Sequence, residues 1–482
     1  MDTLQAFINH PFFYWSLVII YIFSIISTIA VILSENRHPV KSLAWVTVLI
    51  LIPLVGLVLY FFFGRNIKNT HMISRRNKRK LQKNEAFRKI DYNRLEQELT
   101  SESIQQIRLA HSLTGASYYP GNDATVFTNG KEKFEVLIKD LLSAENYIHL
   151  QYYIIEDDEI GRKIREILIA KAQSGVKVKV IYDHIGCIHV RNRFFNEMKA
   201  VGIEVYPFFK VTFTPFASRI NWRNHRKVCI IDGKIGYIGG MNIADRYIQG
   251  VKYGVWRDTH IRITGPAISA LQYSFAVDWS FMGLPLLEED VYSTSSKGHP
   301  GIGMQMVTCG PTSQWPNIAF IFHKALANAK KRIYIQTPYF LPTENLLKTL
   351  QSAALSKVDV RIMIPRRSDS NIMRFASFSY IDECLKAGIK IYLYEAGMLH
   401  SKTMVVDDEF SSVGSTNFDF RSFEHNFEGN MFMYSHNMNE QMRNIFHEDM
   451  TYCSRINKTT WRKRPFIEKT AESIIRLLSP IL

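Results

Sequence analysis

One order of strand-like and helix-like segments occurs twice between about residue 120 and the C-terminus. In the first copy, a strand pattern at 147–155 precedes helical spacing over 161–175 and an alternating strand at 176–183. The second copy repeats this order at 332–340, 344–357 and 358–365. Gln151 and Gln336 take equivalent places. A repeat of roughly 180 residues is too long for a solenoid unit, so we predict two related α/β domains, each with a sheet core flanked by helices.

Each copy contains the same short motif, HRKVCIID at 225–232 and HSKTMVVD at 400–407. Because successive strand side chains point to opposite faces, the His and the Lys two residues later project together. The Asp has the opposite parity, and Asp232-Gly233 is a hairpin-turn signal. We therefore expect the two aspartates to hold a strand end or a neighbouring basic group. The motif residues that form the candidate catalytic set are His225, Lys227, Asp232, His400, Lys402 and Asp407.

A second shared element follows each motif, GGMN at 239–242 and GSTN at 414–417. Small residues allow close approach to an anion, and Asn242 and Asn417 supply amide donors. Two imidazoles, two ammonium groups and two amides suit a phosphoryl group. One histidine would attack phosphorus while the other protonates the leaving oxygen and later deprotonates the acceptor. The cations and amides would stabilise the non-bridging oxygens. This chemistry requires no metal and no other cofactor.

Two apolar stretches without charge, 11–34 and 42–64, precede the repeats. Each is long enough to cross a hydrocarbon core of ~30 Å as a helix, and membrane helices tolerate interruptions such as Pro53 and Gly56. A cleaved signal peptide is the alternative for the first stretch, but its apolar run is too long and no small-residue cleavage site follows. We predict a transmembrane hairpin with helices at about 12–34 and 42–63.

Basic residues are concentrated after the second apolar stretch. Between Arg65 and Lys89 lie ten Lys and Arg and one acid, Glu85, which is +9 of the formal net charge of +15. The positive-inside rule then predicts a multi-pass protein of the cell membrane with cytoplasmic catalytic domains. The basic run would act as a topogenic anchor and could also hold anionic lipid headgroups. The net charge suits an anionic partner, whether nucleic acid, phosphate esters or an acidic membrane.

These patterns divide the chain into four expected segments. They are a transmembrane hairpin at 1–66, a basic juxtamembrane linker at 67–118, and two repeat domains at 119–295 and 296–482. In the last segment, a group of apolar residues falls on one helical face: Ile467, Ala471, Ile474, Ile475 and Leu478. This helix would either pack on the domain or lie on the bilayer. The five scattered cysteines, without a CxxC, predict reduced and mostly buried thiols in a cytosolic context.

The duplicated motif resembles that of the phospholipase D superfamily, and nearly the whole chain resembles the bacterial cardiolipin synthase family. Four further stretches carry the resemblance: NRHPVKSLAW at 36–45, WRDTHIRITGPA at 256–267, TPYFLP at 337–342 and RSFEHNFEGN at 421–430. The resemblance implies one active site at the interface of the two repeats and a phosphatidyl-histidine intermediate. It also implies reversible transfer between two phosphatidylglycerol molecules, giving cardiolipin and glycerol.

The resemblance assigns roles to single residues as well. His225 would be the nucleophile and His400 the general acid and base, with the reverse left open because the halves are nearly equivalent. Glu428 matches the superfamily carboxylate that holds a motif histidine, and we expect His400 to be its partner. The first half has Tyr253 at that offset, so we propose Asp258 as the carboxylate for His225.

One position departs from the family pattern. Ser415 matches a hydroxyl residue that contacts the substrate phosphate, whereas Gly240 stands at the equivalent place in the first half. The departure puts hydroxyl contact to the phosphate in doubt on that side.

Other interpretations remain open from the sequence. A phospholipase D-type hydrolase would share the intermediate and use water as acceptor. A membrane-tethered nuclease is allowed by the net charge, but more than half of that charge lies beside the apolar stretches, so we expect membrane phospholipids and not nucleic acid as partners. A scaffold without activity would not need both complete motifs. The oligomeric state is left open, a homo-oligomer included. The strand-end aromatics Tyr152, Tyr153, Tyr339 and Phe340 could either be core or line acyl or headgroup pockets. The loop at 210–221 could either meet the membrane or be a surface loop with a buried corner.

Overall fold

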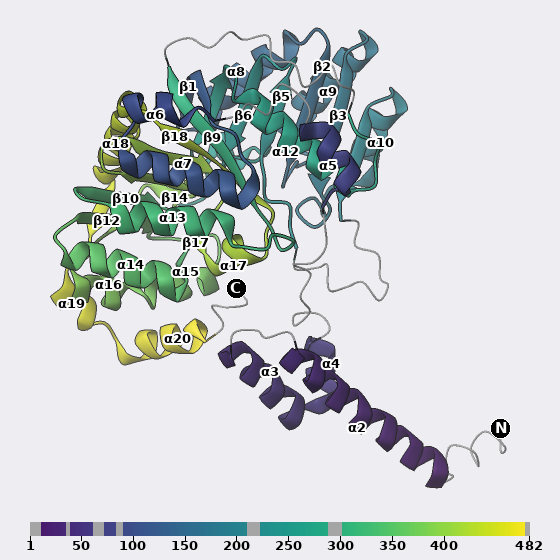
Figure 1. The fold of residues 1–482 in the computed structure, drawn as a ribbon, viewed down its shortest axis with the longest axis vertical. Helices are drawn as coiled ribbons and strands as arrows, with labels where there is room; N and C mark the ends of the chain where they lie inside the picture. The colour runs from purple at the N-terminus through teal and green to yellow at the C-terminus, as the bar shows by residue number, and fades with distance from the viewer. Residues whose placement is uncertain are drawn as a thin grey trace. The chain divides into compact units, whose positions relative to one another are not determined.

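The computed structural model describes residues 11–34, 39–60, 72–82, 90–209, 222–287 and 301–477. The chain forms two compact units (Figure 1). The first unit comprises Met1–Ile67 and Val211–Asn221, and the second comprises Lys68–Lys210 and Trp222–Leu482. The loop at 210–221 lies outside the described residues.

Among its described residues, the first unit contains the apolar helices α2 (Pro11–Ser34), α3 (Pro39–Leu51) and α4 (Pro53–Leu59). The prediction of one helix over about 42–63 is wrong, because the chain breaks at Ile52 (φ −135°, ψ 69°). Pro53 causes the break, since proline lacks an N–H and disfavours helical geometry in the residue before it. Among the helices of the described residues, none combines the length and the apolarity that a bilayer crossing requires.

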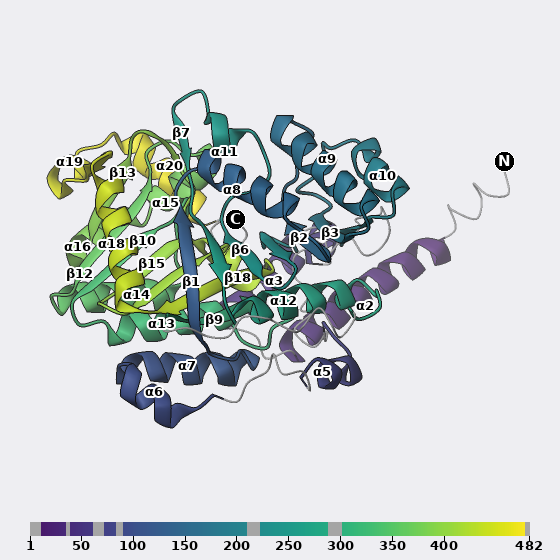
Figure 2. The same ribbon diagram turned by 90° about the horizontal axis from the view of Figure 1, so that it is seen from above.

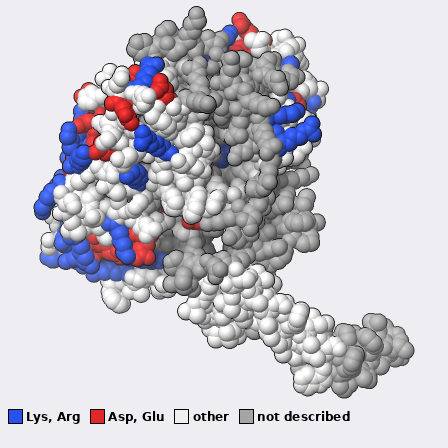
Figure 3. All heavy atoms as spheres, in the orientation of Figure 1, with Lys and Arg blue, Asp and Glu red and all other residues white. Residues whose placement is uncertain are grey.

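Many of the described side chains of this unit are apolar and exposed. Trp15, Phe23 and Leu43 are each more than half exposed, whereas Ile32 and Leu49 form a small buried cluster with Tyr60. On the face shown in Figure 3, the described atoms of this unit include neither basic nor acidic side chains. Basic and acidic side chains in that view belong to the second unit.

The second unit is built on one 15-stranded sheet with the order β19-β13-β12-β10-β15-β16-β18-β9-β1-β8-β6-β5-β2-β3-β4. Figure 2 shows part of this sheet, with several of its strands labelled. The strands of the first repeat are β1 (Tyr119–Phe127), β2 (Tyr147–Tyr152), β3 (Lys177–Asp183), β4 (Glu204–Phe208), β5 (Val228–Ile231), β6 (Ile235–Gly239) and β8 (His260–Thr264). The strands of the second repeat are β9 (Ile302–Cys309), β10 (Arg332–Gln336), β12 (Asp359–Pro365), β13 (Lys390–Tyr394), β15 (Thr403–Val406), β16 (Phe410–Gly414), β18 (Glu428–Tyr434) and β19 (Cys453–Arg455).

The strand order is the same in both repeats when it is followed outward from the centre of the sheet. β1-β8-β6-β5-β2-β3-β4 corresponds to β9-β18-β16-β15-β10-β12-β13. The outer strands β2, β3 and β4 are parallel, as are β10, β12 and β13. The repeats join where β1 pairs with β9, across a register shift between Tyr119 and Asn122. The predicted α/β repeat is therefore confirmed, and its two copies share a single sheet.

Helices cover both faces of this sheet. Those of the first repeat are α8 (Gly130–Leu142), α9 (Glu159–Gln173), α10 (Asn192–Ala200), α11 (Arg246–Gln249) and α12 (Ile268–Phe281). Those of the second repeat are α13 (Asn317–Asn328), α14 (Glu344–Leu355), α15 (Asn371–Phe378), α16 (Ile381–Ala387), α17 (Phe420–Glu424), α18 (His436–Met450), α19 (Lys458–Arg462) and α20 (Phe466–Arg476). Two short strand pairs complete the fold, β11 (Phe340–Leu341) with β17 (Phe418–Asp419), and β7 (Val255–Arg257) with β14 (Gly397–Leu399).

Each repeat has its own apolar core. The predicted linker between the apolar stretches and the repeats contributes α5 (Arg75–Gln82), α6 (Tyr92–Glu98) and α7 (Ser101–Thr114). Ile107 of α7 is buried in the core of the second repeat. Four of the five cysteines are buried and Cys453 is half-buried, as the sequence predicts.

The apolar residues of the C-terminal helix α20 do not all share one environment. Ile475 packs against the second core, and Arg476 pairs with Glu383 of α16 at 2.5 Å. Ile467 and Ile474 are exposed, and Leu478 lies outside the described residues. The apolar face is therefore partly packed on the second repeat and partly exposed, and both predicted roles, packing on the domain and lying on the bilayer, stay predictions.

Candidate active site

Two equivalent strands position the motif histidines and lysines. The apolar residues after each motif lysine form β5 and β15, and every residue of both strands is buried. The Lys227 ammonium donates to the carbonyl of His225 at 2.5 Å, and that of Lys402 lies 2.7 Å from Nδ1 of His400. The His and the Lys of each motif therefore lie together, as the alternation of side chains predicts.

Each histidine is held by a carboxylate from the other repeat. Nδ1 of His225 lies 3.1 Å from the Glu428 carboxylate, and Nδ1 of His400 lies 2.6 Å from that of Asp258. The predicted partners were Glu428 for His400 and Asp258 for His225, so this pairing is wrong although both carboxylates are correctly identified. The exchanged pairing brings both motifs into one composite site.

Backbone pairing between the repeats explains the exchange. The N–H of His225 donates to the carbonyl of Phe427 at 2.9 Å, and that of His400 donates to the carbonyl of Arg257 at 2.7 Å. The residue before each carboxylate is thus bonded to the histidine of the other repeat. The offset from the histidine was misleading, because 28 residues separate His400 from Glu428 whereas 33 separate His225 from Asp258.

Burial and neighbouring charges keep the site in one protonation state. Burial lowers the pKa of His225, and burial together with Lys402 lowers that of His400 to about 4. Burial would raise the pKa of Glu428 and Asp258, but the neighbouring histidines and lysines lower both. Near neutral pH the two imidazoles are therefore neutral and both carboxylates are charged. A neutral imidazole whose Nδ1–H donates to a carboxylate has a free lone pair on Nε2.

The two motif aspartates lie at the far ends of β5 and β15. Asp232 accepts from the N–H groups of Asn146 and Tyr147 at 2.8 and 2.7 Å, immediately before and at the start of β2. Asp407 accepts from those of Lys331 and Arg332 at 2.7 and 3.0 Å at the start of β10. Their backbones are left-handed (φ 52° and 49°), as the hairpin turns require. The expectation that they hold a strand end is confirmed.

Two of the three predicted phosphate contacts, Asn242 and Ser415, form hydrogen bonds within the protein. Asn242 donates to the Tyr247 hydroxyl at 2.7 Å, and its Oδ1 accepts from the N–H of Ile154 at 3.1 Å. The hydroxyl of Ser415 donates to Glu428 at 2.5 Å. The side-chain oxygen of Asn417 is buried and has no partner among the described residues. A role of these three residues in phosphate binding stays a prediction.

Gly240 departs from the family pattern for a steric reason. A Cβ at this position would lie 2.1 Å from Oδ1 of Asp258. The N–H groups of Gly240 and Ser415 donate to the carbonyls of Thr259 and Gly429, which shows that the two positions are equivalent. The space that the Ser415 side chain fills in one repeat is therefore taken by the shorter carboxylate in the other.

Two buried arginine clusters beside the site were not predicted. Arg226 pairs with Asp278 at 2.6 Å and donates to the carbonyl of Glu428 at 3.0 Å. Arg257 pairs with Asp449 at 2.6 Å and donates to the carbonyl of Asp258 at 2.8 Å. The two repeat glutamines complete the clusters, Gln151 on Asp278 and Gln336 on Asp449. The equivalent positions of Gln151 and Gln336 in the two repeats are the feature of the sequence that points to these clusters.

The strand-end aromatics divide between core and site. Tyr152 and Phe340 lie in the two apolar cores. The edge of the Tyr153 ring faces His225, with centroids 4.9 Å apart. Tyr339 donates to Asp369 at 2.7 Å. Tyr153 is therefore the one of these four that contacts a motif histidine.

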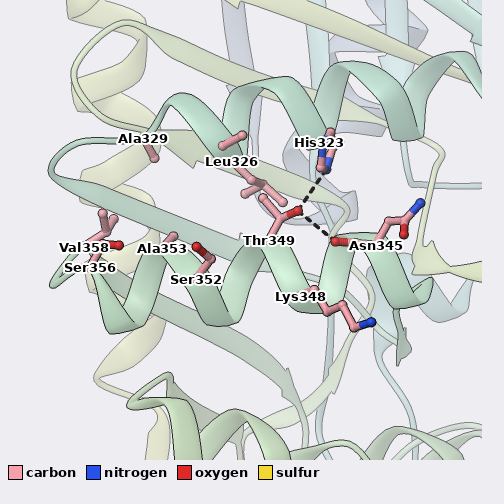
Figure 4. A pocket seen from close by; sticks show the side chains of 11 residues that line it. His323, Leu326, Ala329, Asn345, Lys348, Thr349, Ser352, Ala353, Ser356 and Val358 are labelled. Atoms are coloured by element: carbon pink, nitrogen blue, oxygen red, sulfur yellow. Dashed lines mark hydrogen bonds between the residues drawn. The ribbon is translucent and has the colours of Figure 1, made fainter.

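A hollow of about 590 Å³ lies elsewhere, between α13 and α14 (Figure 4). Thr349 bonds there to His323 at 2.9 Å and to the carbonyl of Asn345 at 2.8 Å. No motif residue lines this hollow. In the part of the chain that the structure describes, no group of three or more His, Cys, Asp or Glu is arranged to hold a metal ion.

Comparison with known proteins identifies the family of the chain. The family model described as "Cardiolipin synthase, PLD-like domain" matches residues 137–270 and 322–450, and the phospholipase D-nuclease N-terminal model matches 17–65. The chain is 40% identical to the major cardiolipin synthase of Bacillus subtilis, over 96% of this chain and 98% of that protein. It is 39% identical to a cardiolipin synthase of Halalkalibacterium halodurans, over 97% and 95% of the two chains.

A solved structure shares the fold at low sequence identity. The phosphatidylserine synthase of Haemophilus influenzae superposes with a TM-score of 0.60 at 12% identity, covering 78% of this chain and all of that one. This likeness concerns the fold alone. The family models and the full-length relatives show more: the chain belongs to the cardiolipin synthase family, with two phospholipase D-like repeats.

Proposed function

We propose that this protein is a phosphatidyltransferase that converts two phosphatidylglycerol molecules into cardiolipin and glycerol through a phosphatidyl-histidine intermediate. The observation that carries the proposal is the exchanged pairing of His225 with Glu428 and of His400 with Asp258. It places two neutral imidazoles and two lysines from different repeats in one buried site. The full-length relatives named cardiolipin synthase supply the substrate class.

The first half-reaction forms the intermediate. Nε2 of His225 attacks the phosphorus of the donor lipid, and the bond from phosphorus to the glycerol oxygen breaks. Because His400 is neutral at rest, it first takes up one proton from solvent in the substrate complex and then gives that proton to the glycerol oxygen. Lys227 and Lys402 stabilise charge on the non-bridging oxygens, with Asn242 and Asn417 as candidate amide donors.

The second half-reaction consumes the intermediate. His400 takes the proton from the hydroxyl of a second phosphatidylglycerol, whose oxygen attacks phosphorus while the bond to Nε2 of His225 breaks. Glu428 and Asp258 hold the imidazoles in the required tautomer and stabilise each one when it carries positive charge. All steps are reversible, so added glycerol also exchanges into phosphatidylglycerol.

The N-terminal unit is, in the same proposal, a hairpin in the cell membrane with the repeats on the cytoplasmic side. Support comes from α2, which contains no charged residue, and from its exposed apolar side chains, including Trp15 and Phe23. The ten basic residues between Arg65 and Lys89 support the orientation. Protease treatment of inverted and right-side-out vesicles tests it, and cleavage of the repeats only from outside the cell would overturn it.

The direct test uses purified full-length protein in phosphatidylglycerol vesicles with a chelator present. We expect cardiolipin and glycerol to appear in equal amounts. Phosphatidic acid as the main product would make the protein a hydrolase. No lipid turnover would contradict the proposed function, and cleavage of DNA by the same preparation would favour a nuclease.

A further inference from the structure

Two arginines, Arg223 and Arg421, lie on the His225 side of the site and take no part in the steps above. The carbonyl of Arg223 accepts from the N–H of Phe427 at 2.8 Å, and that of Arg421 accepts from the N–H of Asn426 at 3.0 Å. Two consecutive residues of one segment thus tie both arginines to the stretch that leads into Glu428. Both guanidinium groups act on Tyr153, lowering its pKa against the effect of burial, and the Tyr153 ring contacts His225.

Arg223 differs from the other buried arginines. Arg226 and Arg257 each have a carboxylate at 2.6 Å, whereas Arg223, only 4% exposed, has no carboxylate within 4 Å among the described residues. Its side chain donates to the carbonyl of Trp222 at 3.3 Å. A buried charge without a partner is costly, so such groups are found where a ligand completes them.

The charges around Arg223 do not cancel. Asp183 faces it, but the Asp183 carboxylate already accepts from the N–H groups of Gly186 and Asn224, both at 2.9 Å. Burial lowers the pKa of Arg223, Asp183 opposes that effect, and Arg421 lowers it further. Arg421 is half-buried and also lacks an ion pair in the described part of the chain. Arg223 and Arg421 are therefore two neighbouring cations beside the site, and neither forms an ion pair with a described residue.

The other repeat has no such excess. Met398 takes the place of Arg223, two residues before the motif histidine, and is fully buried in an apolar core. Arg246 takes the place of Arg421, four residues after the motif asparagine, and it pairs with Glu156 at 3.6 Å. The uncompensated pair exists at one end of the site only, which a role in stabilising the repeat itself does not explain.

We propose that Arg223 and Arg421 bind the phosphate of the acceptor phosphatidylglycerol. The inference rests on the proposed function, because the acceptor and the product carry a second phosphate that water and glycerol lack. The planar guanidinium fork matches a phosphate with two parallel hydrogen bonds. The pair therefore favours the anionic lipid acceptor over neutral acceptors, and so favours synthesis over hydrolysis.

The test compares two reactions of the full-length protein in vesicles. Exchange of labelled glycerol into phosphatidylglycerol requires the donor lipid and a neutral acceptor, whereas cardiolipin formation requires the acceptor phosphate. We expect Arg223→Gln and Arg421→Gln to reduce cardiolipin formation about tenfold or more, the usual effect of losing a hydrogen bond between charged groups, and to leave glycerol exchange unchanged. Arg223→Lys, which keeps the charge and loses the fork, should fall between.

Controls separate the possible failures. Arg94→Gln removes an exposed arginine that pairs with Glu98 in α6 and should change neither reaction. Inorganic phosphate at millimolar concentration should inhibit cardiolipin formation more than glycerol exchange in the unmodified protein if free phosphate also binds. Equal loss of both reactions in the variants, or loss of neither, would overturn the acceptor site. Absence of both reactions in the unmodified protein would instead contradict the proposed function.

Discussion

The two repeats share a strand order but differ in the residues that surround each histidine. His225 is held by Glu428, which also accepts from Ser415, whereas His400 is held by Asp258, which occupies the space opposite Gly240. One side combines a long carboxylate with a serine, and the other combines a shorter carboxylate with a glycine. The comparison teaches that a symmetric backbone can keep both histidines oriented while the side chains around them diverge.

The buried arginines extend the difference. Arg226 and its partner Asp278 belong to the same repeat, whereas Arg257 reaches across to Asp449 of the other. Both donate to the carbonyl of a carboxylate residue that holds a histidine. The two clusters thus serve equivalent positions through different connections, and only the His225 side has the additional cations Arg223 and Arg421.

The largest expected effect comes from removing either histidine. His225→Ala and His400→Ala should each reduce cardiolipin formation about a thousandfold or more, because one removes the nucleophile and the other the acid and base. Labelled donor lipid should still modify His400→Ala slowly and His225→Ala not at all. Labelling of the reverse pattern would exchange the two roles, and substantial turnover in either variant would contradict a single composite site.

Removing the orienting carboxylates should have the next largest effect. Glu428→Gln and Asp258→Asn should each lower kcat about a hundredfold, because the imidazole loses its fixed tautomer and the charge that stabilises its protonated form. Imidazole nitrogen signals in NMR spectra identify the partner. Glu428→Gln should shift the signals of His225 and spare those of His400, and Asp258→Asn should do the opposite. The reverse result would contradict the exchanged pairing.

Alkaline pH should lower kcat/KM by about tenfold for each pH unit above the pKa of Lys402. Burial lowers the pKa of Lys402 to about 8. The ammonium form is present below this value and is lost as pH rises through it, so kcat/KM should fall above about pH 8. Lys402→Arg should move the fall to higher pH, because a guanidinium stays protonated. An unchanged alkaline limb in that variant would assign the limb to another group.

The smallest effects should come from the single substitutions Gly240→Ser and Ser415→Gly, each of which introduces the residue type of the other repeat. Gly240→Ser should lower the free energy of unfolding by about 1–3 kcal/mol, the usual cost of overpacking, because the added Cβ meets Asp258. Ser415→Gly should cost about 1 kcal/mol through the lost hydrogen bond to Glu428. Denaturant titration measures both. A Gly240→Ser variant as stable as the unmodified protein would show that the two repeats tolerate the same side chains.

Local patterns predicted most of the fold. Alternation at 176–183 and helical spacing at 161–175 correspond to β3 and α9 within two residues. Motif parity placed each His beside its Lys and each Asp at a strand end. The helix break at Ile52 was not predicted, because membrane helices tolerate proline. In this chain the restriction that Pro53 places on the preceding residue ends the helix.

The repeat, the two motifs, the candidate carboxylates and the family could all be identified in the sequence, because each depends on short-range periodicity or on residues close together in the chain. Three features became apparent in the folded molecule alone: which carboxylate holds which histidine, why Gly240 replaces a hydroxyl residue, and which buried arginine lacks a counter-charge. These features depend on β1–β9 pairing and on contacts between segments far apart in the chain, such as His225 with Glu428, 203 residues apart. In the first repeat, five more residues separate the histidine from the equivalent carboxylate than in the second. This difference conceals the equivalence of Asp258 and Glu428 in the sequence.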